Sequence, residues 1–173
     1  IYLYFTMKKH LIIICGLPGA GKTSLVKSLK LNTFESLKGY KYLDLDKKIL
    51  ELNPSYVDLA ELINDKGFQQ FRDIESQQLK NIVNSQEKLV ISIGGGALSQ
   101  EHFELLKERA ILIELNISID ESIKRTSKDS SRPLSKGNSR VQLENIFAKR
   151  KNILSKAHFQ INGDLPLEQQ VEE

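Results

Sequence analysis

The chain contains no tryptophan, one cysteine, one methionine and only four prolines among its 173 residues. A single cysteine excludes an internal disulfide, and because Cys15 ends the apolar run that begins at Leu11, we expect a buried thiol without a chemical function. No apolar run approaches the about 18 residues that a membrane-spanning helix requires, and no charged leader precedes a cleavable apolar segment. We therefore expect a cytoplasmic protein without a membrane partner.

Neither sign of charge dominates, because 25 basic and 22 acidic residues are mixed along the chain and leave a net charge of +3. There is no dense basic stripe, and no aromatic side chains are interleaved with basic ones for bases to stack on. Nucleic acid is therefore not an expected partner. The length is that of one domain, which buries about 70% of the surface that its unfolded chain exposes, so a single core is expected.

The expected domain covers residues 7–173, without an internal repeat or a linker. Met7 is the only methionine and is followed by Lys8 and Lys9, which is typical of a natural start. Residues 1–6 are then expected to be an artificial addition or an overextended reading frame, and we leave them out of the predicted fold.

The most informative segment is Gly16 to Thr23, which reads Gly-Leu-Pro-Gly-Ala-Gly-Lys-Thr and fits the phosphate-binding pattern G-x-x-x-x-G-K-[ST] in full. It follows an apolar run and opens a helix, so several backbone N–H groups are expected to face one anion. Lys22 is expected to reach the β- and γ-phosphates of a nucleotide, and the Thr23 hydroxyl to ligate Mg²⁺. The predicted nucleotide-binding residues here are Gly19, Ala20, Gly21, Lys22, Thr23 and Ser24.

Apolar runs alternate with segments of helical spacing along the rest of the chain. The predicted strands are Leu11–Cys15, Tyr42–Asp46, Leu89–Ile93, Ala110–Leu115 and Phe159–Ile161. The predicted helices are Lys22–Lys30, Lys47–Leu52, Val57–Asn64, Phe68–Asn84, Gln100–Glu108, Asp120–Thr126 and Val141–Lys156. Residues 127–140 are polar and basic and are expected to form a mobile loop, and the tail after Asp164 has little pattern. This alternation predicts a three-layer α/β/α fold with a mostly parallel sheet and ligands beyond the carboxyl ends of its strands.

Two carboxylates, Asp44 and Asp46, alternate in the second predicted strand. Their side chains should point to opposite faces until the strand ends, where both can turn toward bound phosphates. Beside a Mg-nucleotide they suggest a metal partner and an acceptor for a substrate hydroxyl. Two solvated acids at a strand end are the structural alternative.

Three further features could carry chemistry, and each also has a purely structural explanation. Arg72 precedes Glu75 by three residues on a predicted helix, so the carboxylate could hold the guanidinium in place, or the two could form a simple surface pair. The triplet Gly94-Gly95-Gly96 lets the backbone approach a ligand, although glycines also serve tight turns. Arg132 in the polar loop could close over a transferring phosphate, but exposed loop arginines usually have no specific role.

Taken in order, these motifs and the late helical Arg150 resemble those of shikimate kinases, and the resemblance runs from Met7 to about Ile161. It implies the P-loop NTPase fold of the nucleoside monophosphate kinase type. It also implies transfer of the γ-phosphate of ATP to the 3-hydroxyl of shikimate in a Mg²⁺-dependent reaction, by a monomer whose lid lies at about residues 127–140. The motifs that carry the resemblance are Gly-Leu-Pro-Gly-Ala-Gly-Lys-Thr, Leu-Asp-Leu-Asp, Phe-Arg-x-x-Glu, Gly-Gly-Gly-Ala and Arg-Pro-Leu.

The resemblance also implies a role for each matching residue. Asp46 would contact the shikimate hydroxyls and orient or deprotonate the attacking one, and Asp44 would bind Mg²⁺, through water. Arg72 and Arg150 would grip the substrate carboxylate. The backbone of Gly95, with that of Gly94 and Gly96 beside it, would bind the ring. Lys22, Asp46 and the lid residue Arg132 would form the catalytic set, and Arg125 would pack against adenine.

The chain departs from the family pattern at three places. Ser135 replaces the second leucine of the lid motif, Asn152 and Leu154 stand where a proline and a tyrosine are common, and residues 162–164 lack an arginine near the adenine. Two other functions therefore stay open. One is a P-loop kinase for another polyol acid such as gluconate, and the other is a degenerate kinase-like protein that binds nucleotide without turnover.

Overall fold

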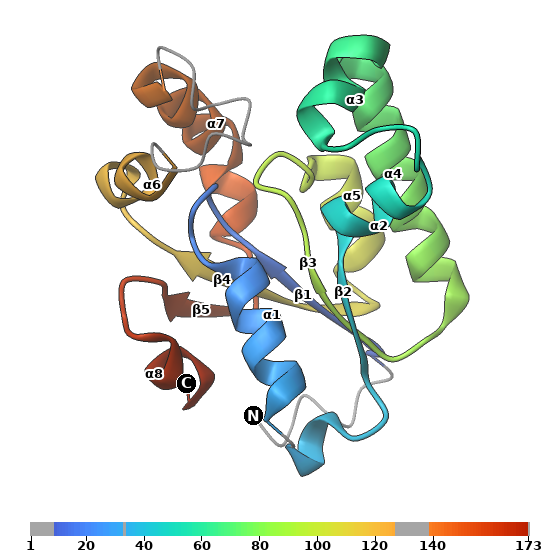
Figure 1. Cartoon of the computed structure of the whole chain (residues 1–173). Helices are drawn as coiled ribbons and strands as arrows, with labels where there is room; N and C mark the ends of the chain where they lie inside the picture. Colours follow the sequence, from blue (N-terminus) through green and yellow to red (C-terminus); the bar gives the residue numbers. More distant parts are fainter. Residues whose placement is uncertain (1–8, 33, 127–138, 173) are drawn as a thin grey trace.

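The computed structural model describes residues 9–32, 34–126 and 139–172, and Figure 1 shows its arrangement. Its centre is a five-stranded sheet in the order β2-β3-β1-β4-β5, and every neighbouring pair is parallel. The strands are β1 (Leu11–Cys15), β2 (Lys41–Asp44), β3 (Leu89–Ser92), β4 (Ala110–Asn116) and β5 (Phe159–Asn162).

Helices cover both faces of this sheet, because the side chains of successive strand residues point to opposite faces. Leu11 and Ile13 pack into one core with α2 to α5 and the end of α7, whereas Ile12 and Ile14 pack into a second core with α1 and α8 (Figure 1). The helices are α1 (Lys22–Leu31), α2 (Leu45–Glu51), α3 (Leu59–Lys66), α4 (Phe68–Ser85), α5 (Gln100–Leu106), α6 (Ile119–Thr126), α7 (Ser139–Leu154) and α8 (Leu167–Glu172). The predicted three-layer α/β/α class is therefore confirmed.

The structure corrects the prediction around the second strand. β2 ends at Asp44, and α2 begins at Leu45, so Asp46 lies in the first turn of a helix rather than in a strand. The physical reason is local: the Asp44 side chain accepts a hydrogen bond from the backbone N–H of Lys47 and caps the helix. Both carboxylates consequently lie at the carboxyl end of β2, where a ligand is expected.

Two further corrections concern the second half of the chain. The tail contains the helix α8, whose Val171 packs against the second core, although its six residues are too few for a clear periodic pattern. Helix α7 already includes Ser139 and Arg140, so the predicted loop ends earlier than expected. Arg132 and the other residues from 127 to 138 lie outside the described residues.

Burial of Cys15 at the end of β1 agrees with the expectation of an inert thiol. Desolvation raises the pKa of this thiol to about 12, so it stays protonated at neutral pH. None of the helices in the described ranges is long and apolar enough to cross a membrane.

Candidate active site

The phosphate-binding loop lies between β1 and α1, as the sequence predicts. Gly16, Gly19 and Gly21 have φ angles of 138°, 76° and 95°, which side chains other than glycine rarely adopt. A β-carbon at Gly16 would also collide with the carbonyl oxygen of Leu115 on β4. The glycines therefore let the loop curve back over the sheet and open α1 at Lys22, with its first N–H groups available to an anion.

Lys22 is held inside this loop. It is buried, and its Nζ donates hydrogen bonds to the carbonyl oxygens of Leu17 at 2.8 Å and Gly16 at 3.2 Å. Helix α6 braces the loop from outside, because Ser122 Oγ donates to the Pro18 carbonyl at 2.6 Å. The ammonium group is therefore positioned at the mouth of the loop, where phosphate oxygens can replace the two carbonyls.

Asp44 and Thr23 meet directly beside this loop. Asp44 Oδ2 accepts hydrogen bonds from Thr23 Oγ1 at 2.6 Å and from Ser92 Oγ at 2.9 Å. One hydroxyl and one carboxylate fit Mg²⁺, which takes most of its other ligands from water and from substrate phosphates. Ser92 was not predicted as a site residue. The feature that could have indicated it is a lone hydroxyl in the otherwise apolar strand β3.

The glycine triplet after β3 brings the other predicted residues together. A β-carbon at Gly94 would lie 3.2 Å from Asp46 Oδ1, and one at Gly96 would overlap the guanidinium group of Arg72. Arg150 of α7 donates to the carbonyl oxygens of Gly96 and Leu98, the latter at 2.6 Å. The carboxylate of Asp46 and the guanidinium groups of Arg72 and Arg150 therefore lie around the triplet, whose glycines have no side chains that would fill this space.

Arg72 is fixed from two directions. Its guanidinium forms an ion pair with Glu75, one turn later on α4, as the spacing predicts. The guanidinium carbon also lies 4.6 Å from the centre of the Phe68 ring and 5.3 Å from that of Phe71, within cation–π range. The two aromatic contacts were not predicted, although Phe68 precedes Arg72 by one helical turn.

Charged groups beside the triplet influence the pKa values of Glu75 and Arg150. Glu75 is only 2% exposed, and burial raises the pKa of its carboxyl while the Arg72 partner opposes that change. Burial also lowers the pKa of Arg150, and repulsion from Arg72 adds to the effect. An anionic group bound by both guanidinium groups would relieve this repulsion.

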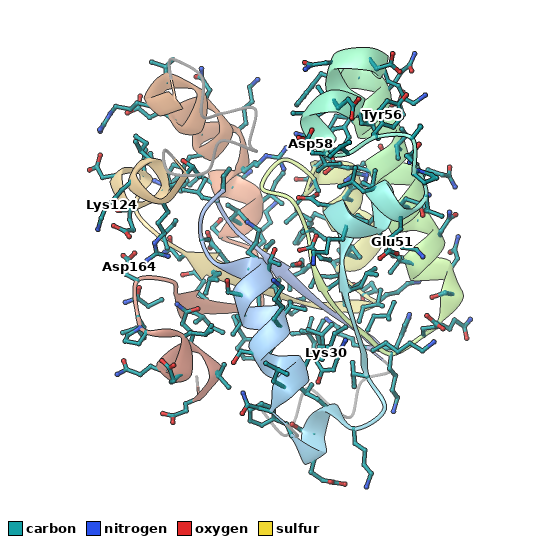
Figure 2. The ribbon with its side chains drawn as sticks, in the orientation of Figure 1. Lys30, Glu51, Tyr56, Asp58, Lys124 and Asp164 are labelled. Carbon is teal, nitrogen blue, oxygen red and sulfur yellow. The ribbon has the colours of Figure 1, made fainter. Side chains whose placement is uncertain are left out.

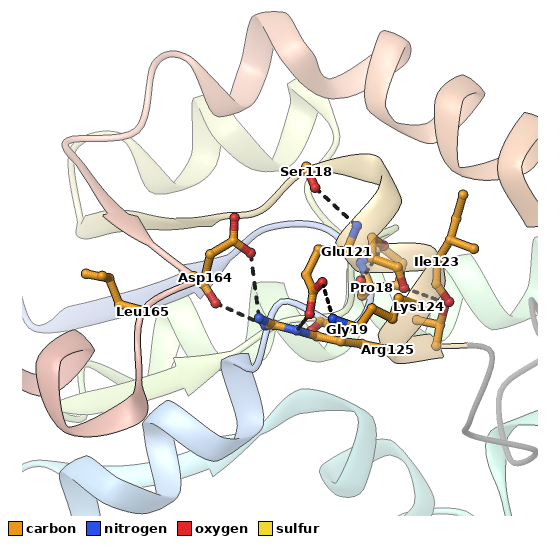
Figure 3. A network of polar contacts seen from close by, with 12 residues as sticks. Pro18, Gly19, Ser118, Glu121, Ile123, Lys124, Arg125, Asp164 and Leu165 are labelled. Atoms are coloured by element: carbon orange, nitrogen blue, oxygen red, sulfur yellow. Dashed lines mark hydrogen bonds and ion pairs between the residues drawn. The ribbon is translucent and has the colours of Figure 1, made fainter.

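Arg125 of α6 approaches the phosphate-binding loop from the opposite side of the site. Its Nε donates to Glu121 Oε1 at 2.7 Å, and its Nη1 donates to the Gly163 carbonyl at 3.0 Å and the Gly19 carbonyl at 3.5 Å (Figure 3). The guanidinium is therefore tied both to the loop and to the segment after β5.

Most of these residues line one cleft of ≈ 660 Å³. Figure 2 shows Asp58 where α3 begins, and Lys124 and Asp164 across the molecule near α6 and β5. The apolar wall of Leu59, Ile63 and Phe71, together with the polar Asp58, was not predicted. The predicted residues in the lining are Gly19, Gly21, Lys22, Thr23, Ser24, Asp44, Asp46, Arg72, Gly94, Gly95, Gly96 and Arg125. Of the others, Ala20 is a buried residue of the loop itself, and Arg150 contacts the triplet from outside this lining.

A parallel sheet that carries a phosphate-binding loop, with a carboxylate and two arginines beside it, is typical of a P-loop kinase. Sequence comparison identifies the group more narrowly. The family profile described as "Shikimate kinase" matches residues 18–173. The chain belongs to the shikimate kinase family, whose members are ATP-dependent phosphotransferases that act on a hydroxyl group.

Similar proteins agree with this assignment. The shikimate kinase of a Sulfurihydrogenibium species is 32% identical over 165 residues, which cover 94% of this chain and 93% of that protein. The shikimate kinase of Persephonella marina is 30% identical over 154 residues, 88% of each chain. Among solved structures, that of Acinetobacter baumannii shikimate kinase in complex with shikimate gives a TM-score of 0.78 at 25% identity, covering 94% of this chain and 87% of that one. A gluconokinase from Sinorhizobium meliloti gives 0.57 at 16% identity, covering 93% and 86%, and shows the fold alone.

Proposed function

We propose that the cleft transfers the γ-phosphate of ATP to the 3-hydroxyl of shikimate, giving shikimate 3-phosphate and ADP. The observation that carries the proposal is the group of Asp46, Arg72 and Arg150 around the glycine triplet. It suits a ring that bears both a carboxylate and hydroxyls. The membership of the family points to the same substrate.

On the acceptor side, Arg72 and Arg150 would bind the substrate carboxylate, because two planar guanidinium groups match its geometry and neutralise its charge. The backbone of Gly94, Gly95 and Gly96 would lie against the ring. Asp46 would accept a hydrogen bond from the 3-hydroxyl and hold its oxygen toward the γ-phosphate, taking the proton as the new bond forms.

On the nucleotide side, the chain's own groups align and stabilise the phosphates, which is most of what phosphoryl transfer requires. Lys22 would leave its carbonyl partners to bind the β- and γ-phosphate oxygens. Thr23 and Asp44 would hold Mg²⁺, which supplies charge neutralisation when bound. Arg132 would close over the moving phosphate, as the family resemblance implies, in a lid within residues 127–138.

Replacement of Arg72 by lysine is expected to raise the KM for shikimate about 10-fold, the effect of one lost charge-assisted hydrogen bond. Lysine keeps the charge, but it loses the planar fork and the stacking on Phe68. Steady-state kinetics with shikimate as the varied substrate test this, with the KM for ATP as the internal control. An unchanged KM for shikimate would remove Arg72 from the substrate site.

The Gly96→Ala variant is expected to raise the same KM about 3- to 10-fold, because the new methyl group takes the space of the Arg72 guanidinium. Displacing the guanidinium also weakens its ion pair with the buried Glu75, so the midpoint of thermal unfolding should fall while the protein still folds. The measurements are the KM for shikimate and a thermal melt. A variant with wild-type KM would show that Arg72 does not bind substrate from its place beside Gly96.

The specificity for the phosphate acceptor distinguishes a shikimate kinase from a kinase that acts on gluconate. ADP release from Mg-ATP is measured with shikimate, with gluconate and without an acceptor. We expect release that depends on shikimate alone. Release with gluconate would favour the alternative substrate, and nucleotide binding without release for any acceptor would favour the degenerate protein. A monomeric state, a cytoplasmic location and a single domain over residues 7–173 remain predictions from the sequence.

A further inference from the structure

The guanidinium of Arg125 is held by four partners. Besides the two backbone carbonyls, its Nε is paired with Glu121 and its Nη2 lies 3.6 Å from Asp164 Oδ1. Figure 3 shows these contacts converging from α6, from the phosphate-binding loop and from the segment after β5. Three parts of the chain that are distant in sequence thus meet at one side chain.

These contacts fix the orientation of the Arg125 guanidinium group as well as its position. The N–H bonds of a guanidinium lie in its plane, so partners around its edge fix that plane while they leave the flat faces open. The Arg125 side chain remains 32% exposed and contributes to the lining of the cleft. A flat cation held in this way is suited to stack on a planar heteroaromatic ring.

The two carboxylates differ in what they connect. Glu121 lies one turn before Arg125 on α6, and its hydrogen bonds from Arg125 and Lys124 hold the pKa of its carboxyl below the ordinary value. Asp164 belongs to another segment, and its pair with Arg125 reaches from after β5 to α6. It is half exposed, so its removal should cost little folding stability.

We propose that Asp164 and Glu121 are positioning residues that fix the plane of Arg125, so that it serves as a platform for the base of the bound nucleotide. They act through Arg125 and do not touch the phosphates. The proposal rests on the proposed function only in that the cleft binds ATP. Asp164 should therefore strengthen the binding of a nucleotide to the protein, but not the binding of an analogue that lacks the base.

Two ligands separate the base from the phosphates: Mg-ADP, and Mg-tripolyphosphate, which has no base. Calorimetry with the Asp164→Asn variant is expected to show about 2- to 5-fold weaker binding of Mg-ADP, in the range of an exposed ion pair, and unchanged binding of Mg-tripolyphosphate. Asp164→Glu should restore much of the loss, and Glu121→Gln should repeat it. Glu87→Gln, which removes a carboxylate paired with Lys41 elsewhere on the surface, is the matched control and should bind both ligands normally.

The outcomes are distinct. Equal weakening of both ligands would mean that Asp164 only supports the loop, and no weakening of Mg-ADP would mean that it has no role; either result overturns the proposal. In an Arg125→Lys background, Asp164→Asn should cause no further loss of Mg-ADP affinity, and an undiminished loss there would show that Asp164 does not act through Arg125. Because binding is measured, a protein that fails to phosphorylate shikimate would refute the proposed function without affecting this comparison.

Discussion

The Lys22→Met variant is expected to lose turnover by about 10³-fold, the scale for removing a preorganised charge from a transition state. The ammonium group is buried in the loop and held by the carbonyls of Gly16 and Leu17, so its position in the loop is fixed. Charge accumulates on the transferring phosphate and on the leaving oxygen, where Lys22 would bind. Methionine keeps much of the length of the side chain, so the loss would report the charge.

The measurement is kcat with saturating Mg-ATP and shikimate, together with a thermal melt of each protein. Lys30→Met is the matched control, since Lys30 lies at the exposed far end of the same helix α1 (Figure 2). Its kcat should equal that of the wild type. Substantial turnover by a folded Lys22→Met protein would show that this loop does not perform the reaction.

The Asp46→Asn variant is expected to lower kcat by about 10²- to 10⁴-fold, the range for loss of a positioned general base. Asparagine keeps the size and can still orient a hydroxyl, but it cannot take up a proton. Asp46 lies in the first turn of α2 beside Gly94, whereas the nucleotide is proposed to bind at the glycines of the phosphate-binding loop. The KM for ATP should therefore change by less than about 3-fold, because substitutions at separate sites usually act independently.

The assay is steady-state kinetics at several pH values, accompanied by direct measurement of shikimate binding. Glu51→Gln removes an exposed carboxylate from the other end of α2 and controls for the change in charge (Figure 2). If Asp46→Asn kept the wild-type kcat while Glu51→Gln behaved normally, the proton would have to leave by another route, and the role of Asp46 would be withdrawn.

The fold was predictable because its signals are local and repeated. Continuous apolar runs at Leu11–Cys15 and at residues 89–91 mark strands buried on both faces, and the intervening helical spacing requires parallel crossovers. The helical position of Asp46 was not predictable from the alternation of side chains along the strand. Asp44 caps α2 and ends the strand, although the alternating pattern continues to Asp46. Helix α8 depends on packing against α1 and the second core, which a six-residue segment does not reveal by itself.

The candidate site was predictable wherever one segment carries its own chemistry. The phosphate-binding loop and the Arg72–Glu75 pair are of this kind, and the structure brings both to the same cleft. Ser92 and Asp164 were overlooked because their contacts join segments distant in sequence, and a hydroxyl or a carboxylate alone has no signature. Arg132 lies outside the described residues, so its role stays a prediction.

The central claim is that this cleft places the γ-phosphate of ATP on the 3-hydroxyl of shikimate. The most direct measurement is ³¹P NMR of a reaction that contains the protein, Mg-ATP and shikimate, with the Lys22→Met protein as the blank. We expect one new phosphomonoester signal, coupled to the proton on C3 of the ring, that grows in step with ADP. Phosphate that appears only as the inorganic ion, or no new signal while nucleotide is bound, would contradict it.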